Sequence, residues 1–68
     1  MATDNEGRAN YAALAKQAKA KVAIWEAEWR DIFEERAAIR EYEGGVDRPQ
    51  AEWLAYREVV EMKKADEQ

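Results

Sequence analysis

The chain has 68 residues, a net charge of −4 at pH 7, and neither cysteine nor histidine. A lone core in so small a scaffold supplies only roughly 3–5 kcal/mol of stability, so such scaffolds usually add disulfides, a metal or a partner chain. The missing cysteine and histidine exclude disulfides, thiolate metal sites and imidazole ligands. Because self-association is the remaining reinforcement, we predict a homodimer.

The side chains that perform most catalytic chemistry are also missing. The chain has no serine, and its one threonine is Thr3, whereas nucleophilic and acid–base catalysis mostly use serine, cysteine, threonine or histidine. Two glutamate pairs, Glu34 with Glu35 and Glu41 with Glu43, are the nearest acid–base candidates. Such neighbours diverge on a helix and are typical of a solvated acidic face. We therefore predict no enzymatic activity, no cofactor and no metal site.

The polar N-terminal segment, residues 1–7, lacks hydrophobic periodicity and predicts a flexible leader before a single folded domain at residues 8–65 and a polar tail at 66–68. Asp4 and Glu6 stand where a secretory signal would be basic, and no apolar run approaches the roughly 20 residues of a membrane span. We expect a soluble cytoplasmic protein.

Residues 8–43 contain no proline or glycine and are rich in alanine, glutamate, lysine and arginine, which favours one long helix. Its apolar residues recur at spacings of three, four and seven on one face that only Arg36 interrupts. The members of this face are Tyr11, Leu14, Ala15, Ala18, Val22, Trp25, Trp29, Ile32, Phe33 and Ile39. Ile24 and Tyr42 lie off the face and are predicted to be surface residues.

The dipeptide Gly44-Gly45 predicts the end of this helix. Glycine takes the left-handed conformation after a last helical turn without the steric penalty of a Cβ atom. A turn this short makes the flanking helices antiparallel neighbours. The sequence therefore predicts an all-α helical hairpin.

The start of the second helix carries its own signals. Asp47 can cap it while Gln50 reaches back to the cap, and Pro49 fits the first turn, where its missing N–H is not needed. Since proline disfavours a helical conformation at the preceding residue, Arg48 is an alternative cap. We predict the helix over residues 49–65.

The second helix has two apolar faces, and a helix of this kind is usually sandwiched between neighbours. Trp53, Tyr56 and Val60 form one face, and aromatic residues are enriched in interface hot spots. We predict that these three residues bind a protein partner. The nearly opposite face, which can dock on the first helix, consists of Ala51, Leu54, Ala55, Val59 and Met62.

The two predicted helices differ in length, about 50 Å against about 25 Å at 1.5 Å per residue. An antiparallel hairpin would leave the first part of the longer helix uncovered, so its apolar face predicts a dimerisation surface. The residues of this surface are Tyr11, Leu14, Ala18, Val22 and Trp25. The alternative is that the long helix breaks near residues 19–21 and folds back as a third helix, although no helix-breaking residue marks that point.

Charge is divided along the chain. Residues 8–24 carry four basic residues and no acid, whereas residues 25–47 carry eight acids and three arginines. Lys16, Lys19 and Lys21 suggest weak nucleic-acid binding, and the acidic segment suggests an inhibitor that mimics a phosphate backbone to block a nucleic-acid-binding protein. Both remain alternatives to the favoured interpretation, a small protein–protein interaction module.

The segment from residue 34 to 59 resembles a helix, acidic-Gly-Gly, helix element of proteobacterial phage, plasmid and other mobile-element proteins, often near the end of a replication-associated chain. Pro49 departs from that pattern. The resemblance implies an accessory protein of a phage, plasmid or bacterium and implies no chemistry. It is carried by Glu35, Arg36, Ala37, Ile39, Glu41, Tyr42, Glu43, Gly44, Gly45, Arg48, Ala51 and Glu52.

Overall fold

A computed structural model describes residues 10–67, so the predicted leader at residues 1–7, the predicted helix start at Arg8 and residue 68 lie outside the described part. The described residues form three helices and no strand: α2 (Tyr11–Val22), α3 (Ala27–Glu43) and α4 (Arg48–Glu67). The all-α prediction is confirmed. The predicted tail is helical as far as Glu67.

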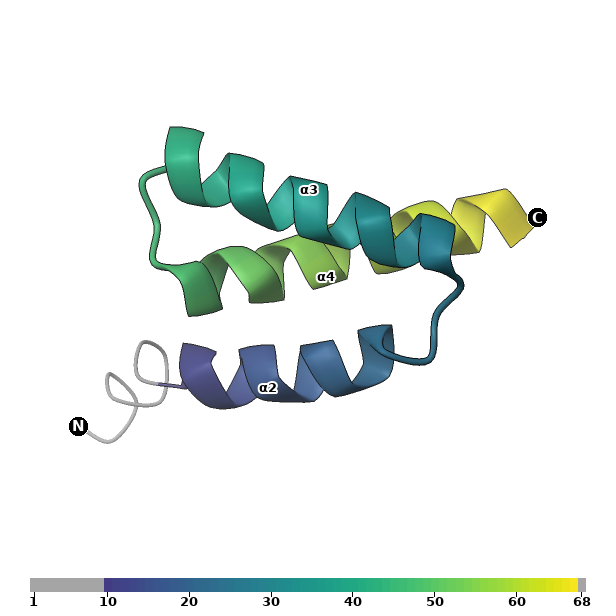
Figure 1. Ribbon diagram of the computed structural model, residues 1–68, viewed down its shortest axis with the longest axis horizontal. Coiled ribbons are helices and arrows are strands. Elements are labelled where there is room, and N and C mark those ends of the chain that lie inside the picture. The colour runs from purple at the N-terminus through teal and green to yellow at the C-terminus, as the bar shows by residue number, and fades with distance from the viewer. Residues whose placement is uncertain (1–9, 68) are drawn as a thin grey trace.

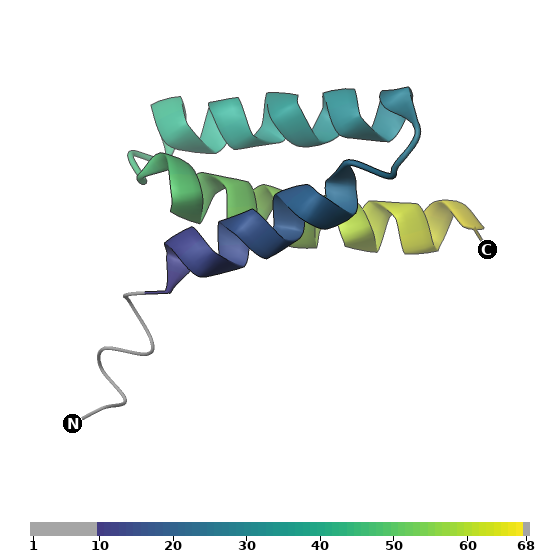
Figure 2. The ribbon, with the colours of Figure 1, turned by 60° about the horizontal axis from the view of Figure 1, so that its bottom comes forward.

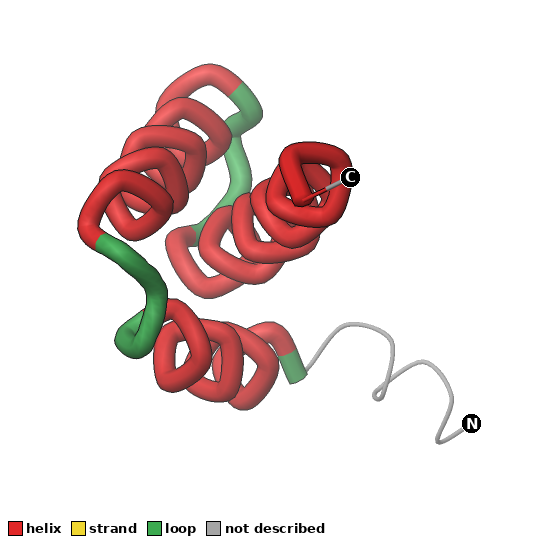
Figure 3. The backbone as a smooth tube through the Cα atoms, turned by 90° about the vertical axis from the view of Figure 1, so that its right-hand side faces the viewer, coloured by secondary structure: helices red, strands yellow, loops and turns green. Residues whose placement is uncertain are grey.

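Helix α4 is the central element of the bundle (Figure 1). It packs along both α2 and α3, whereas α2 and α3 contact each other only weakly. Helices α2 and α4 run in the same direction and α3 runs against them, and the end-on view shows the three grouped as a bundle (Figures 1 and 3). In the turned view α2 crosses α4 obliquely (Figure 2). The helix with two apolar faces is therefore sandwiched, as its pattern predicted.

The prediction of one continuous helix over residues 8–43 is wrong. Helix α2 ends at Val22 and α3 begins at Ala27, and the described molecule measures 41 Å along its longest axis, less than the about 50 Å that such a helix needs. The alternative with a third helix is the one adopted, with the break after Val22 rather than at residues 19–21. The described residues form a bundle of three helices.

The break between α2 and α3 forms without glycine or proline. The backbone N–H of Ile24 donates to the carbonyl of Lys21 at 3.3 Å and that of Trp25 to the carbonyl of Val22 at 2.9 Å, so the last turn tightens into i to i−3 bonds. Glu26 then adopts an extended conformation, with φ −64° and ψ 154°. Isoleucine and tryptophan have lower helix propensity than alanine, which lowers the cost of interrupting the helix at these residues. Burial of both α2 and α3 against α4 outweighs the cost that remains.

The core lies where the three helices meet. Its largest fully buried side chains are Phe33 of α3 and Val59 of α4, joined by Val22 of α2. The other buried hydrophobic residues are all alanine, namely Ala15, Ala18, Ala37, Ala51 and Ala55. Because alanine adds little bulk at a contact, the helices can approach closely, and the few large side chains supply most of the burial.

The turn between α3 and α4 needs glycine at both positions for different reasons. Gly44 continues the helical conformation, but a Cβ atom there would lie 2.6 Å from the carbonyl oxygen of Arg40. Gly45 has a φ of +67° and open space around a Cβ atom. Asp47 follows, and its carbonyl accepts the first α4 hydrogen bond from the N–H of Ala51 at 2.9 Å, which places Asp47 at the N-cap and Pro49 in the first turn.

We expect Gly45→Ala to lower the free energy of unfolding by about 1–2 kcal/mol, because an L side chain is strained in the left-handed region even where space is open. Urea denaturation followed by circular dichroism measures the loss. Gly45→Asn is the matched control and should lose less, since asparagine tolerates this conformation better. Equal stability of Gly45→Ala and the wild type would contradict the role of the turn.

Candidate functional site

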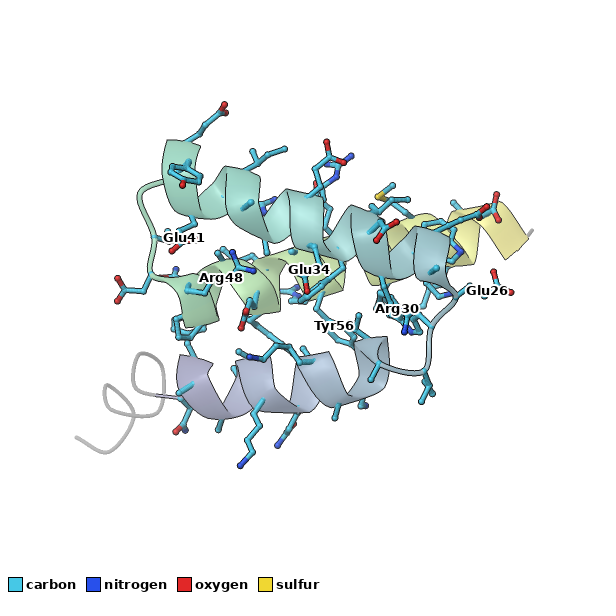
Figure 4. All side chains as sticks on the ribbon, in the orientation of Figure 1. Glu26, Arg30, Glu34, Glu41, Arg48 and Tyr56 are labelled. Carbon is cyan, nitrogen blue, oxygen red and sulfur yellow. The ribbon has the colours of Figure 1, made fainter. Side chains whose placement is uncertain are left out.

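Aromatic side chains form a continuous stack on one side of α4. The Trp53 and Tyr56 rings lie 5.7 Å apart between centroids, and the Tyr56 and Trp25 rings lie 5.8 Å apart at an interplanar angle of 13°. Tyr56 lies between α4 and α2 (Figure 4) and packs on the core, and all three residues are half-buried. Two of the three predicted partner-binding residues, Trp53 and Tyr56, are thus already engaged within the chain, and Val60 is half-buried.

The five residues predicted for dimerisation lie in or beside the intramolecular core. Ala18 and Val22 are buried, and Tyr11, Leu14 and Trp25 are half-buried. Helix α2 folds back on α4, so the uncovered stripe from which we predicted a dimer is not present. Intramolecular packing accounts for the burial of these side chains.

Arg48, the first residue of α4, joins two helices through three carboxylates. Its Nε donates to Glu52 at 3.0 Å, its Nη1 to Glu41 at 3.1 Å and its Nη2 to Glu34 at 3.2 Å. The hydrogen bond to Glu52, and then that to Glu41, raises the pKa of Arg48 above its ordinary value, so the guanidinium stays charged at any ordinary pH. Figure 4 shows Arg48 beside Glu34 and Glu41 between α3 and α4.

Glu52 extends the Arg48 network to α2. Its side chain is buried, with 7% of the residue exposed, and its Oε1 lies 3.5 Å from Nζ of Lys19. Lys19 is therefore an intramolecular partner, while Lys16 and Lys21 are exposed. Only two of the three lysines proposed to contact nucleic acid remain without an ion pair to a described residue.

Glu58 of α4 explains why Arg36 interrupts the apolar face of α3. Its carboxylate accepts hydrogen bonds from Arg36 at 2.8 Å and from Arg40 at 3.2 Å. The arginines clamp α3 to α4 beside the core and are only partly exposed. Arg36 is a bridging residue.

The outer face of α3 carries a surface that the sequence analysis did not identify as a binding site. Tyr42 is 85% exposed and Ile39, three residues earlier, is 45% exposed, although Ile39 was predicted to lie in the core. Glu35 and Glu43, both exposed, stand one turn before and one turn after Ile39 on the same side. The signal in the sequence was the apolar pair at i and i+3 with Tyr42 off the main face.

The acids of this outer face are free of the networks described above. Glu28, Asp31, Glu35 and Glu43 are exposed and make no ion pair with another residue between 10 and 66. We call these four acids, with Ile39 and Tyr42, the α3 outer face. An apolar pair within an acidic surface matches a partner that presents both apolar and basic groups.

Neither a metal-binding cluster nor a membrane-spanning helix is found in the part of the chain that the structure describes. Its residues include no cluster of three or more acidic side chains arranged to hold a metal ion. None of its helices is long and apolar enough to cross a membrane.

Comparisons with known proteins identify no relative: no protein-family model matches the chain, and no curated protein and no solved structure matches it.

Proposed function

We propose that this chain is a non-enzymatic helical interaction module that binds a basic, partly apolar surface of another protein through the α3 outer face. The observation that carries the proposal is the exposure of Tyr42 and Ile39 side by side, at 85% and 45%. Large apolar side chains scattered singly on a surface are ordinary, whereas contiguous exposed apolar patches mark interaction sites. Tyrosine is also among the residues enriched in interface hot spots.

The charge of the face supports the choice of partner. Glu35 and Glu43 flank the apolar pair, and Asp31 and Glu28 continue the acidic face toward the start of α3. None of the four makes an ion pair with another residue between 10 and 66. Charged groups at the rim of an interface mainly set specificity and the association rate, while a central apolar cluster supplies affinity. In this module Ile39 and Tyr42 supply the affinity and the acids select a basic partner.

The rest of the bundle supports the proposal by holding α3 in place. The core residues, the Arg48 network and the Glu58 clamp all fix the inner face of α3 on α4, so the outer face is a preformed surface that loses little entropy on binding. Ile39 and Tyr42 also lie within the segment that resembles mobile-element proteins. An accessory role in a phage, plasmid or bacterium remains a prediction.

The test compares Ile39→Ser/Tyr42→Ser with the wild type. Proteins that the wild-type chain captures from a lysate of the cells that encode it are identified and purified. Their affinity for the wild-type chain and for each variant is then measured by calorimetry. We expect the double variant to bind at least about thirtyfold more weakly, as loss of a hot spot of about 2 kcal/mol requires. Arg57→Ser, an exposed position on α4, is the control and should bind like the wild type. Unchanged affinity of the double variant would refute the proposal.

A second candidate function is favoured by the line of Glu28, Asp31 and Glu35 along α3. These acids could imitate a nucleic-acid backbone and block a nucleic-acid-binding protein. Binding by charge alone falls steeply between 50 and 200 mM salt and does not need Tyr42. Calorimetry of the same complex at both salt concentrations decides between the two: a large salt effect with an unaffected Tyr42→Ser variant identifies the mimic.

A further inference from the structure

Lys63 of α4 places its ammonium group over two tryptophan rings at the end of the bundle where α2 joins α3. Its Nζ lies 5.3 Å from the ring centroid of Trp25 and 5.0 Å from that of Trp29. Both distances fall within the about 6 Å range over which an aromatic face attracts a cation. Tyr56 stacks on Trp25 and so helps to fix the orientation of that ring.

The two tryptophans line an open depression of about 400 Å³. Its other lining residues include Glu26 and Asp66, which are exposed and form no ion pair within the described residues. The ammonium of Lys63 lies over aromatic rings, and it has no carboxylate within 4 Å among the side chains described between residues 10 and 66. Indole faces with nearby unpaired carboxylates make up a surface suited to a cation.

We propose that Trp25 and Trp29 form a binding site for an alkylammonium group, the side chain of a lysine on a partner protein, and that Lys63 occupies this site in the free chain. We choose an alkylammonium group as the ligand because Lys63 already places an ammonium group on these rings. Glu26 and Asp66 at the rim would pair with the incoming charge. This site lies at the α2–α3 junction and goes beyond the function proposed for the α3 outer face.

Lys63 can leave the tryptophan rings so that a lysine of a partner protein takes its place. Lys63 is half-buried, its stem is long and flexible, and its position is near the end of α4 that projects past the other helices (Figures 1 and 2). The incoming ammonium regains the same ring contacts, and Lys63 can move into water. Because the internal lysine competes, it lowers the apparent affinity of the site for any external cation.

The experiment titrates the full chain and its Lys63→Ala variant with n-butylammonium, following the indole N–H signals of the three tryptophans by NMR. We expect saturable shifts at Trp25 and Trp29 in both proteins, with binding about fivefold tighter or more in Lys63→Ala. Trp53 is the internal control and should not shift in parallel, because it does not line the depression that contains Trp25 and Trp29. Sodium chloride at equal ionic strength should leave all three signals in place.

Two further arms make the result decisive. Lys64→Ala, an exposed neighbour, should bind n-butylammonium as the wild type does, and Lys63→Gln replaces Lys63→Ala should the latter fail to fold. The peptide acetyl-Gly-Lys-Gly-amide should reproduce the shifts, and its acetyl-lysine form should not. The proposal is overturned if removing Lys63 does not tighten binding, if sodium chloride gives the same shifts, or if acetylation of the peptide has no effect.

Discussion

Phe33→Ala should leave the chain largely unfolded at 25 °C. Phe33 is 1% exposed and contacts a core to which α2 contributes Val22 and α4 contributes Val59, so its loss opens a cavity at the point where all three helices meet. Replacing a buried phenylalanine with alanine costs about 3–5 kcal/mol, which equals the roughly 3–5 kcal/mol that so small a core supplies. Circular dichroism and urea denaturation measure the effect.

Tyr42→Ala is the matched control for Phe33→Ala, because it removes a similar ring from the same helix at a position that is 85% exposed. Surface substitutions of this kind change stability by about 0.5 kcal/mol or less. A Phe33→Ala variant that unfolds cooperatively within about 1 kcal/mol of the wild type would show that the core does not depend on this side chain. Comparing the stability of the two variants separates the effect of burying an aromatic ring from the effect of its size.

The break between α2 and α3 could not be predicted from the sequence. Residues 19–27 contain no glycine or proline, and the apolar spacing stays in phase across the junction, so local signals favour continuity. The interruption at Ile24 and Trp25 is set by packing of α2 on α4, a contact between segments far apart in the chain. Propensity is a weak guide where tertiary burial competes with it.

The second helix was predicted more successfully, because its apolar pattern indicated how many neighbours the helix packs against. Two apolar faces on one helix predicted neighbours on two sides, and α4 packs on both α2 and α3. What the pattern left open was the origin of the second neighbour. The second neighbour of α4 could have been another chain, but it is α2 of the same chain. Since α2 is covered in this way, no uncovered apolar face on it calls for a dimer.

The candidate surface was predicted only in part. Tyr42 and Ile24 were predicted to be exposed and are, at 85% and 86%. Ile39 was placed in the core because its spacing fits the apolar face drawn over residues 8–43. On α3 it stands two residues after the buried Ala37 and so lies on another side of the helix, and 45% of the residue is exposed. A wheel drawn over one long helix misses this divergence, since it assigns one buried direction to two separate helices.

Arg48→Met should lower the free energy of unfolding by about 2–3 kcal/mol, the second largest effect that we expect. The substitution keeps an apolar stem of similar length but removes the donor to Glu52, a carboxylate that is only 7% exposed. Removing one member of a fully buried ion pair costs about 3–5 kcal/mol because the other charge is stranded. The cost is smaller here, since the Arg48 side chain is 39% exposed and water screens the pair. Lys19, 3.5 Å from Glu52, reduces the loss. Urea denaturation gives the value.

The double variant Arg48→Met/Glu52→Met tests the cause of that loss. If a stranded carboxylate is responsible, replacing both partners with apolar residues should recover most of the stability, and the two single losses will exceed the loss in the double variant. Arg57→Met on the exposed side of α4 should change stability by about 0.5 kcal/mol or less. Strict additivity of the single losses would mean that Arg48 and Glu52 act independently, and that a stranded carboxylate is not the cause of the loss in Arg48→Met.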